Sequence, residues 1–314
     1  MAAAAGLRGL GRFGAVLSAM VTPFDSEGRL DLDGAAALAR WLVDHGNDGL
    51  VVAGTTGESP VLSDVEKGDL WRTVSEAVTV PVIAGSGTAD TAHSVELTKV
   101  AKAAGAAGIL AVTPYYNRPS QAGLAAHFRA VAGATDLPVL IYDIPIRTGR
   151  KVEHETIVTL AREVPTIVGV KDAAANPAAS AHLLAEAPAG FELYSGDDGL
   201  TLPLLAIGCS GLIGVASHWA GEELAEMLSA FDKGDVETAR QINARLIESY
   251  RFETGDLTPN PMPTKAMLRV LGLPAGQCRL PIGPAPAGLE ERAGQVLERL
   301  RAQPRAEPEA SGVG

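Results

Sequence analysis

The stretch PVLIYDIPIRTGRKVEHETIVTLAREVPTIVGVK, residues 138–171, holds two short apolar runs separated by a segment with helical periodicity. The runs are PVLIYD at 138–143 and TIVGVK at 166–171, and the helical segment spans 154–163. Neither run alternates apolar and polar residues, which predicts strands that are covered on both faces, as in a parallel sheet. The stretch therefore predicts one strand, helix, strand unit of an α/β fold.

The same unit repeats along the chain in both directions. Six further apolar runs bring the number of expected strands to eight, at 15–21, 49–54, 81–85, 108–113, 191–196 and 211–217. Further helices are expected at 33–45, 64–78, 91–104, 121–134, 177–186, 200–207 and 222–232. Eight such pairs within residues 14–233 match a (β/α)8 TIM barrel, whereas a doubly wound sheet normally has fewer strands.

The pattern changes after residue 233. Helices without intervening strands are expected at 235–253, 264–271 and 289–301, so residues 234–302 are expected to form a C-terminal helical extension. Residues 1–13 are expected to be a flexible N-terminus, and residues 303–314, which are rich in Pro, Glu and Ala, a disordered tail. The sequence leaves open whether the extension completes the mouth of the barrel or only packs outside it.

The composition argues against several classes of partner. The formal net charge is −11, and no cluster of Lys and Arg with interleaved aromatic residues is present to neutralise a nucleic-acid backbone. Cys209 and Cys278 stand far apart without metal-ligand spacing, which fits a reducing compartment and predicts small core residues. The run of four alanines near the start is too short for a signal peptide or a membrane span. We expect a cytoplasmic protein.

Polar residues follow the apolar runs at the points where the strands are expected to end. In TIM barrels the chemistry lies at the carboxyl ends of the strands and in the loops that follow. These side chains should therefore converge on one mouth: Thr55, Thr56, Thr113 to Tyr116, Tyr142, Lys171, Ser195 to Asp198 and Ser217.

Lys171 and Tyr142 end the two runs quoted above. Partial desolvation at a strand end lowers the pKa of an ammonium group and frees the amine to attack a carbonyl. Neighbouring parallel strands would place the Tyr142 hydroxyl near that amine, where a phenol relays protons. The structural alternatives are a lysine paired with Asp172 and a core tyrosine ring with a solvated hydroxyl.

Two loops offer groups that bind carboxylates. GTTGES at 54–59 supplies two hydroxyls and free backbone amides, and Arg147 in IPIRTG would clamp a carboxylate with two hydrogen bonds. The alternatives are a tight turn and a solvated loop arginine. GTTGES lacks the lysine of a phosphate loop, and GSGTAD at 85–90 lacks the third glycine of a dinucleotide fingerprint, so no nucleotide cofactor is expected.

No metal site is expected. Asp197 and Asp198 have no His or Glu at ligand spacing, which favours a helix N-cap over a metal site. The six histidines form no His-x-x-x-His pair, and most are expected on the surfaces of helices.

Six ordered motifs resemble one family over nearly the whole chain, from VTPF at 21–24 to RLPIGP at 279–284. They are GTTGES, VTPYYNRPSQ at 112–121, YDIPIRTG at 142–149, GVKDA at 169–173, SGDD at 195–198 and LTPNPMPTK at 257–265. Together they resemble the dihydrodipicolinate synthase and N-acetylneuraminate lyase superfamily of class I pyruvate aldolases.

The resemblance implies Lys171 as the Schiff-base lysine and a proton relay of Thr56, Tyr142 and Tyr116, the last donated across a tight dimer interface. It also implies that Thr55 and Thr56 hold the pyruvate carboxylate. The assembly implied is a homotetramer built from two tight dimers, without a metal or another cofactor.

The resemblance further implies that the Ile213 carbonyl lines the pocket and that Gly196 lies near it. Arg147 is similar to the arginine that binds the carboxylate of L-aspartate 4-semialdehyde, and Arg147-Thr148-Gly149 favours the dipicolinate branch over the sugar-acid branch. The implied reaction is a lyase-class condensation of pyruvate with this aldehyde to 4-hydroxy-tetrahydrodipicolinate, in diaminopimelate and lysine biosynthesis.

Three alternatives stay open: a related class I aldolase or lyase acting on another aldehyde or sugar acid, a non-catalytic sensor of pyruvate-like acids, and a metal-dependent aldolase. The resemblance also bears on feedback, because lysine-inhibited relatives bind lysine at the dimer interface through six side chains. The matching positions here are Ser59, Asp64, Lys67, Ala89, His93 and Tyr115. Only the serine and the tyrosine are kept, so weak or absent inhibition by lysine is expected.

Overall fold

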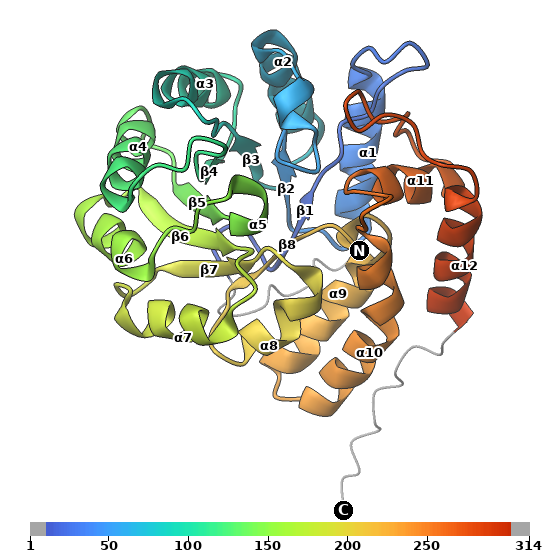
Figure 1. Cartoon of the computed structure of the whole chain (residues 1–314). Helices are drawn as coiled ribbons and strands as arrows, with labels where there is room; N and C mark the ends of the chain where they lie inside the picture. The colour runs from blue at the N-terminus through green and yellow to red at the C-terminus, as the bar shows by residue number, and fades with distance from the viewer. Residues whose placement is uncertain (1–10, 303–314) are drawn as a thin grey trace, which may run out of the picture.

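In the computed structural model, which describes residues 11–302, eight parallel strands close into a barrel in sequence order (Figure 1). Each strand pairs with the next, and β8 pairs with β1. The strands are β1 (Val16–Ala19), β2 (Gly49–Val52), β3 (Val82–Gly85), β4 (Gly108–Val112), β5 (Val139–Asp143), β6 (Ile167–Asp172), β7 (Glu192–Ser195) and β8 (Gly211–Gly214). The expected TIM barrel is confirmed.

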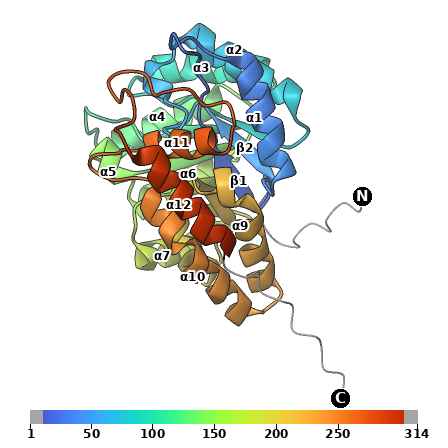
Figure 2. The same ribbon diagram turned by 90° about the vertical axis from the view of Figure 1, so that its right-hand side faces the viewer.

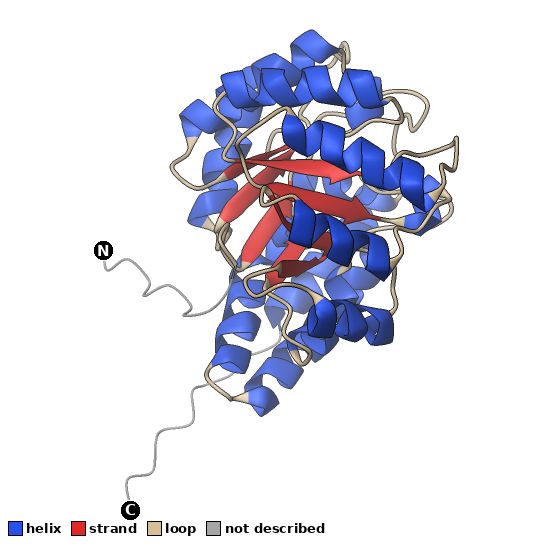
Figure 3. Ribbon diagram, turned by 90° about the vertical axis from the view of Figure 1, so that its left-hand side faces the viewer, coloured by secondary structure: helices blue, strands red, loops and turns tan. Residues whose placement is uncertain are grey.

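Helices surround the barrel on all sides (Figure 3). They are α1 (Leu32–Asp44), α2 (Asp64–Ala77), α3 (Thr91–Ala103), α4 (Gln121–Gly133), α6 (His154–Glu163), α7 (Pro177–Glu186), α8 (Thr201–Leu205) and α9 (Ser217–Asp232). Side-chain caps define several starts: Asp31 accepts from Gly34 N, and Ser63 forms a capping box with Glu66. Such caps satisfy backbone N–H groups that have no partner within the helix.

Short helical turns follow three strands at the mouth and were not expected from the sequence. They are the 3-10 turns η1 (Ser59–Val61) and η2 (Asp198–Leu200) and the short helix α5 (Pro145–Thr148). The strand expected at 211–217 ends at Gly214, and Ser217 already begins α9. These short helical turns lie in the loops at the carboxyl ends of the strands.

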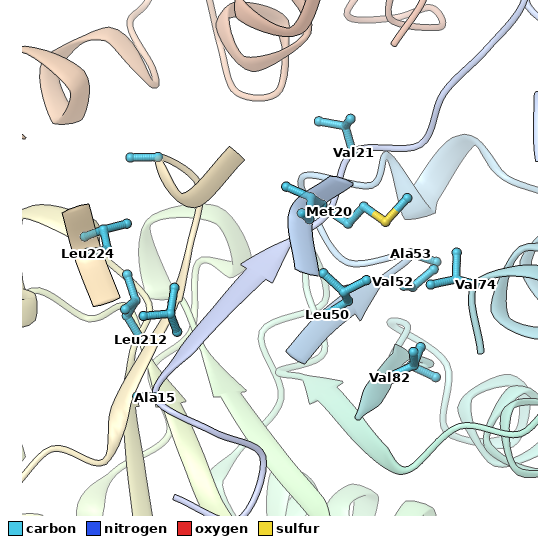
Figure 4. Close-up of a cluster of buried hydrophobic side chains, with 14 of the residues drawn as sticks. Ala15, Met20, Val21, Leu50, Val52, Ala53, Val74, Val82, Leu212 and Leu224 are labelled. Atoms are coloured by element: carbon cyan, nitrogen blue, oxygen red, sulfur yellow. The ribbon is translucent and has the colours of Figure 1, made fainter. Parts of the chain in front are cut away.

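Two apolar layers hold the barrel together. The outer layer lies between the strands and the helices, and Figure 4 shows the part of it around β1, β2 and β8. The inner layer fills the barrel with one side chain or more from nearly every strand, among them Leu17, Ile83 and Leu140. Because the barrel is packed solid, the polar groups of the site are confined to the carboxyl ends of the strands.

The C-terminal extension consists of α10 (Val236–Phe252), α11 (Met262–Val270) and α12 (Leu289–Ala302). α10 packs along α9, and α12 packs on α10 and α11 (Figure 2). Trp219 of α9 meets Phe252 of α10 edge to face, and its indole N–H donates to Ser249 Oγ at 3.0 Å. The extension is thus part of the same hydrophobic core as the barrel.

The predictions for the two ends of the chain concern mainly residues that the structure does not describe. Residues 1–10 of the predicted flexible N-terminus and the predicted tail at 303–314 lie outside the described residues. Within residues 11–13, the Phe13 side chain is buried in the inner layer. Cys209 and Cys278 are buried and unpaired, as expected for small core residues. No helix within residues 11–302 is long and apolar enough to cross a membrane.

Candidate active site

Lys171 and Tyr142 face each other from neighbouring strands. They are direct partners in the ladder between β6 and β5, and Lys171 Nζ lies 4.5 Å from the centroid of the Tyr142 ring. Both side chains are only 5% exposed. Burial lowers the pKa of Lys171 to about 8, while the nearby Asp198 carboxylate opposes this shift and Arg147 adds to it. About a tenth of the amine is then unprotonated at pH 7, enough to act as a nucleophile.

The side chain of Thr55 lies near the Tyr142 phenol. Burial raises the pKa of Tyr142, and the Thr55 side chain, which lies within hydrogen-bonding reach, acts in the opposite direction. The resemblance implied a proton relay of Thr56, Tyr142 and Tyr116. The structure places the Thr55 side chain near the phenol, while the Thr56 hydroxyl accepts from Asn260 Nδ2.

The GTTGES loop has a tightly held backbone. Ala53 and Glu58, which flank the two threonines, both adopt left-handed conformations with φ of 56°. Thr22 Oγ1 donates to Gly57 O at 2.6 Å. Within residues 11–302, the backbone amides of Thr55 and Thr56 donate to no protein acceptor. A fixed turn with free amides and hydroxyls suits a small carboxylate.

The C-terminal extension contacts the same loop. It therefore helps to complete the mouth of the barrel and does not only pack outside it. Asn260 Nδ2 donates to Thr56 Oγ1 at 3.0 Å. Lys265 of α11 forms an ion pair with Glu58 at 2.6 Å, in which both side chains are 1% exposed. The backbone N–H of Arg279 donates to Glu58 Oε2 at 2.8 Å. Sequence reasoning missed Asn260 as a site residue, although it lies in the motif LTPNPMPTK.

A cavity of about 510 Å³ opens beside Tyr142 and Thr55. Arg147, on α5, lines it, and so do Tyr115 and Tyr116. Tyr116 has a φ of 73° and a side chain that is 94% exposed. The cavity has room for two small acids and carries a cation to receive a carboxylate.

Gly196 and Ile213 lie beneath this mouth. A Cβ added to Gly196 would stand 3.1 Å from Lys171 Cε and 2.8 Å from Ala173 Cβ, so the lysine chain passes directly over the glycine. The Ile213 side chain belongs to the inner layer of the barrel. The structure therefore brings Gly196 to Lys171.

The pair Asp197 and Asp198 divides between two tasks. Asp197 caps η2 by accepting from Gly199 N at 3.0 Å, as the sequence predicted. Asp198 is buried and accepts from Val215 N at 2.9 Å and from Ala216 N at 3.2 Å, a task that the sequence did not reveal. Burial raises the pKa of Asp198 to about 6.

Within residues 11–302, no group of three or more His, Cys, Asp or Glu side chains could hold a metal ion. Two histidines depart from the surface positions expected for most of them, because His127 and His218 are buried. His218 Nε2 accepts from Val21 N at 3.1 Å, and burial lowers its pKa to about 4. It is a neutral structural residue.

The model of the dihydrodipicolinate synthetase family matches residues 12–300. The chain belongs to the dihydrodipicolinate synthetase family. It is 50% identical over 289 residues to a protein of Moorella thermoacetica named 4-hydroxy-tetrahydrodipicolinate synthase, covering 91% of this chain and 98% of that one. The family confirms the resemblance seen in the motifs and the expectation of a class I aldolase-type lyase.

Solved structures of the dihydrodipicolinate synthetase family share the fold. The enzyme from Cyanidioschyzon merolae, solved with lysine bound, has a TM-score of 0.90 and 42% identity, covering 93% of this chain and 99% of that chain. A chloride-inhibited dihydrodipicolinate synthase from Acinetobacter baumannii, complexed with pyruvate, has a TM-score of 0.87 and 32% identity, covering 92% and 99%.

Proposed function

We propose that this site condenses pyruvate with L-aspartate 4-semialdehyde to 4-hydroxy-tetrahydrodipicolinate, through a Schiff base on Lys171. One observation carries the proposal: a buried lysine with a pKa of about 8 lies against a tyrosine, beside a cavity that holds an arginine. The family supports the same reaction, because relatives carry the name of this synthase.

The first half of the reaction activates pyruvate. The free amine of Lys171 attacks the ketone carbon, and the carbinolamine loses water to form a protonated imine. Tyr142 donates and removes the protons of these steps, with Thr55 as its partner within reach. The carboxylate of pyruvate lies on the amides and hydroxyls of Thr55 and Thr56.

The second half forms the new carbon–carbon bond. The imine withdraws electrons, so the methyl group loses a proton to give an enamine, which attacks the aldehyde carbon while the aldehyde oxygen takes up a proton. Arg147, at the cavity, binds the carboxylate of the semialdehyde. The amine of the semialdehyde then attacks the imine carbon, which closes the ring and releases Lys171.

The exposed side chain of Tyr116 supports a proposed assembly of several copies. Its exposed side chain and left-handed backbone suit insertion into the cavity of a second copy, where its hydroxyl extends the relay to Tyr142. We infer a homotetramer made of two such dimers. Two buried, unpaired cysteines and a biosynthetic reaction support a cytoplasmic location.

The proposal is tested by a coupled assay. Pyruvate and L-aspartate 4-semialdehyde are supplied, and NADPH oxidation by added dihydrodipicolinate reductase is followed, with Lys171→Ala as control. Turnover that depends on Lys171 is the expected result. If borohydride traps pyruvate on Lys171 but no turnover follows, the semialdehyde is not the substrate. If no adduct forms, the Schiff-base mechanism is wrong.

A further inference from the structure

Within residues 11–302, the Thr56 hydroxyl has one protein partner, and that partner lies in the C-terminal part of the chain. Asn260 Nδ2 donates to Thr56 Oγ1, across 204 positions of sequence, and both side chains are buried. A hydroxyl has one proton to donate and two lone pairs that accept. With a lone pair occupied by Asn260, the proton of Thr56 is left for another acceptor.

A carboxylate accepts hydrogen bonds and donates none. If Thr56 holds the carboxylate of pyruvate, its hydroxyl must point its proton at that carboxylate. We propose that Asn260 is a positioning residue that fixes this direction, by donating to Thr56 Oγ1 so that the hydroxyl donates to pyruvate. The inference rests on the proposed function and extends it, because it makes the C-terminal extension a part of the pyruvate site.

The segment that carries Asn260 is tied to the loop that carries Thr56. Asn260 stands two residues before α11, and the ion pair between Lys265 of α11 and Glu58 ties that helix to the Thr56 loop. Lys265 also lies 4.1 Å from the centroid of the Phe24 ring, and the Arg279 guanidinium lies 4.3 Å from the same centroid. These contacts hold Glu58 in its left-handed conformation, which is strained for a residue other than glycine.

The decisive variant is Asn260→Asp, which keeps the shape of the side chain but replaces the donor with an acceptor. Thr56 must then donate to Asp, and its lone pairs face the carboxylate of pyruvate. We expect the KM for pyruvate to rise at least tenfold, with kcat at saturating pyruvate within about threefold of the unmodified enzyme. Asn260→Ala, which neither donates nor accepts, should give a smaller rise.

A double-mutant cycle separates this effect from the added charge. In a Thr56→Val background no hydroxyl remains to be turned. The factor by which Asn260→Asp raises the KM for pyruvate should therefore be at least tenfold smaller than in the wild-type background. An equal rise in the KM for pyruvate in that background would mean that the introduced aspartate acts through its charge alone, which would overturn the proposal. Wild-type behaviour of Asn260→Asp would overturn it too, since Thr56 would then donate to residue 260 in the native enzyme.

Two controls complete the design. Gln295→Glu makes the same amide-to-carboxylate change at an exposed position of α12 and should leave the KM for pyruvate unchanged. Thermal unfolding and borohydride trapping at saturating pyruvate show that the variants are folded and keep Lys171 reactive. If wild-type enzyme shows neither turnover nor adduct, the proposed function fails. If wild type is active and the Asn260 variants match Gln295→Glu, only this inference fails.

Discussion

Lys171 Nζ sits 4.5 Å from the centre of the Tyr142 ring, and the two residues are paired in register on adjacent strands. The ring shields one side of the amine from water. A charged ammonium loses hydration there and gains only a weak contact with the face of the ring. The pairing thus produces the reactive amine at a cost to the stability of the fold.

That cost predicts a stabilising substitution. The pKa of Lys171 is lowered to about 8 in the folded chain, so below pH 8 folding must bury an ammonium that the unfolded chain leaves in water. The penalty is fully present below pH 8 and fades as the pH approaches the unfolded pKa. Lys171→Met should raise the free energy of unfolding at pH 7 by up to about 3 kcal/mol. Denaturant unfolding at pH 7 and pH 10 measures this, and an equal gain at both values would exclude the explanation.

The same pKa predicts how Schiff-base formation depends on pH. Only the unprotonated amine attacks, so the rate of imine formation with pyruvate should rise about tenfold per pH unit below 8 and level off above it. Rapid quenching with borohydride between pH 6 and pH 9.5 measures the rate. A midpoint near 10.5 would show that Lys171 is not desolvated in solution.

Gly196→Ala should impair catalysis without disturbing the fold elsewhere. The new methyl group would meet Ala173 Cβ at 2.8 Å and Lys171 Cε at 3.1 Å, so the lysine must move away from its position over Tyr142. We expect kcat to fall about a hundredfold, because small displacements of a nucleophile are expensive. Gly190→Ala, at a glycine with open space around it, is not a suitable control because its φ is 82°. Gly133→Ala, which meets nothing within 4 Å, should keep full activity.

Arg147→Ala should discriminate between the two substrates. The side chain lines the cavity and is proposed to bind the semialdehyde carboxylate, so the KM for the semialdehyde should rise at least tenfold. Adduct formation from pyruvate alone should be preserved. Arg251→Ala, at an exposed position on α10, is the matched control. Equal losses for both substrates would assign Arg147 to pyruvate or to the fold.

Inhibition by lysine should be weak or absent. Lys67 is 4% exposed, and the His93 ring lies 2.9 Å from Asp64 Oδ1, at positions where the resemblance implies other side chains in lysine-inhibited relatives. The positive charge of Lys67 would oppose a cationic amino acid at the binding position that the resemblance implies. Turnover measured across lysine concentrations tests this, and inhibition at micromolar lysine would contradict it.

The barrel could be predicted from the sequence because each strand and helix carries its own local pattern. The helices α6 and α7 have the bounds that the periodicity predicted, His154–Glu163 and Pro177–Glu186. The closeness of Lys171 to Tyr142 was expected because both residues end neighbouring strand runs, and the register of the two strands confirms it. In contrast, α5 has only four residues, too few to show any period.

The contacts that complete the site could not be read from the sequence. Asn260 reaches Thr56 from 204 positions away, and Asp198 turns inward to the backbone at Val215, 17 positions on. No local pattern encodes such pairs. Thr55 lies near Tyr142, whereas Thr56 binds Asn260. This difference depends on the directions of the two side chains, which two adjacent threonines in a sequence do not reveal.

The link between Thr56 and Asn260 has a consequence for the order of events during synthesis. A nascent chain can assemble all eight strands once residue 214 has left the ribosome, yet Asn260 and Lys265 follow later. Until they dock, the loop at Thr56 lacks these two contacts. Protein synthesis therefore delivers the strands of the barrel before the residues that position its Thr56 loop, so a chain that ends before Asn260 would lack both contacts.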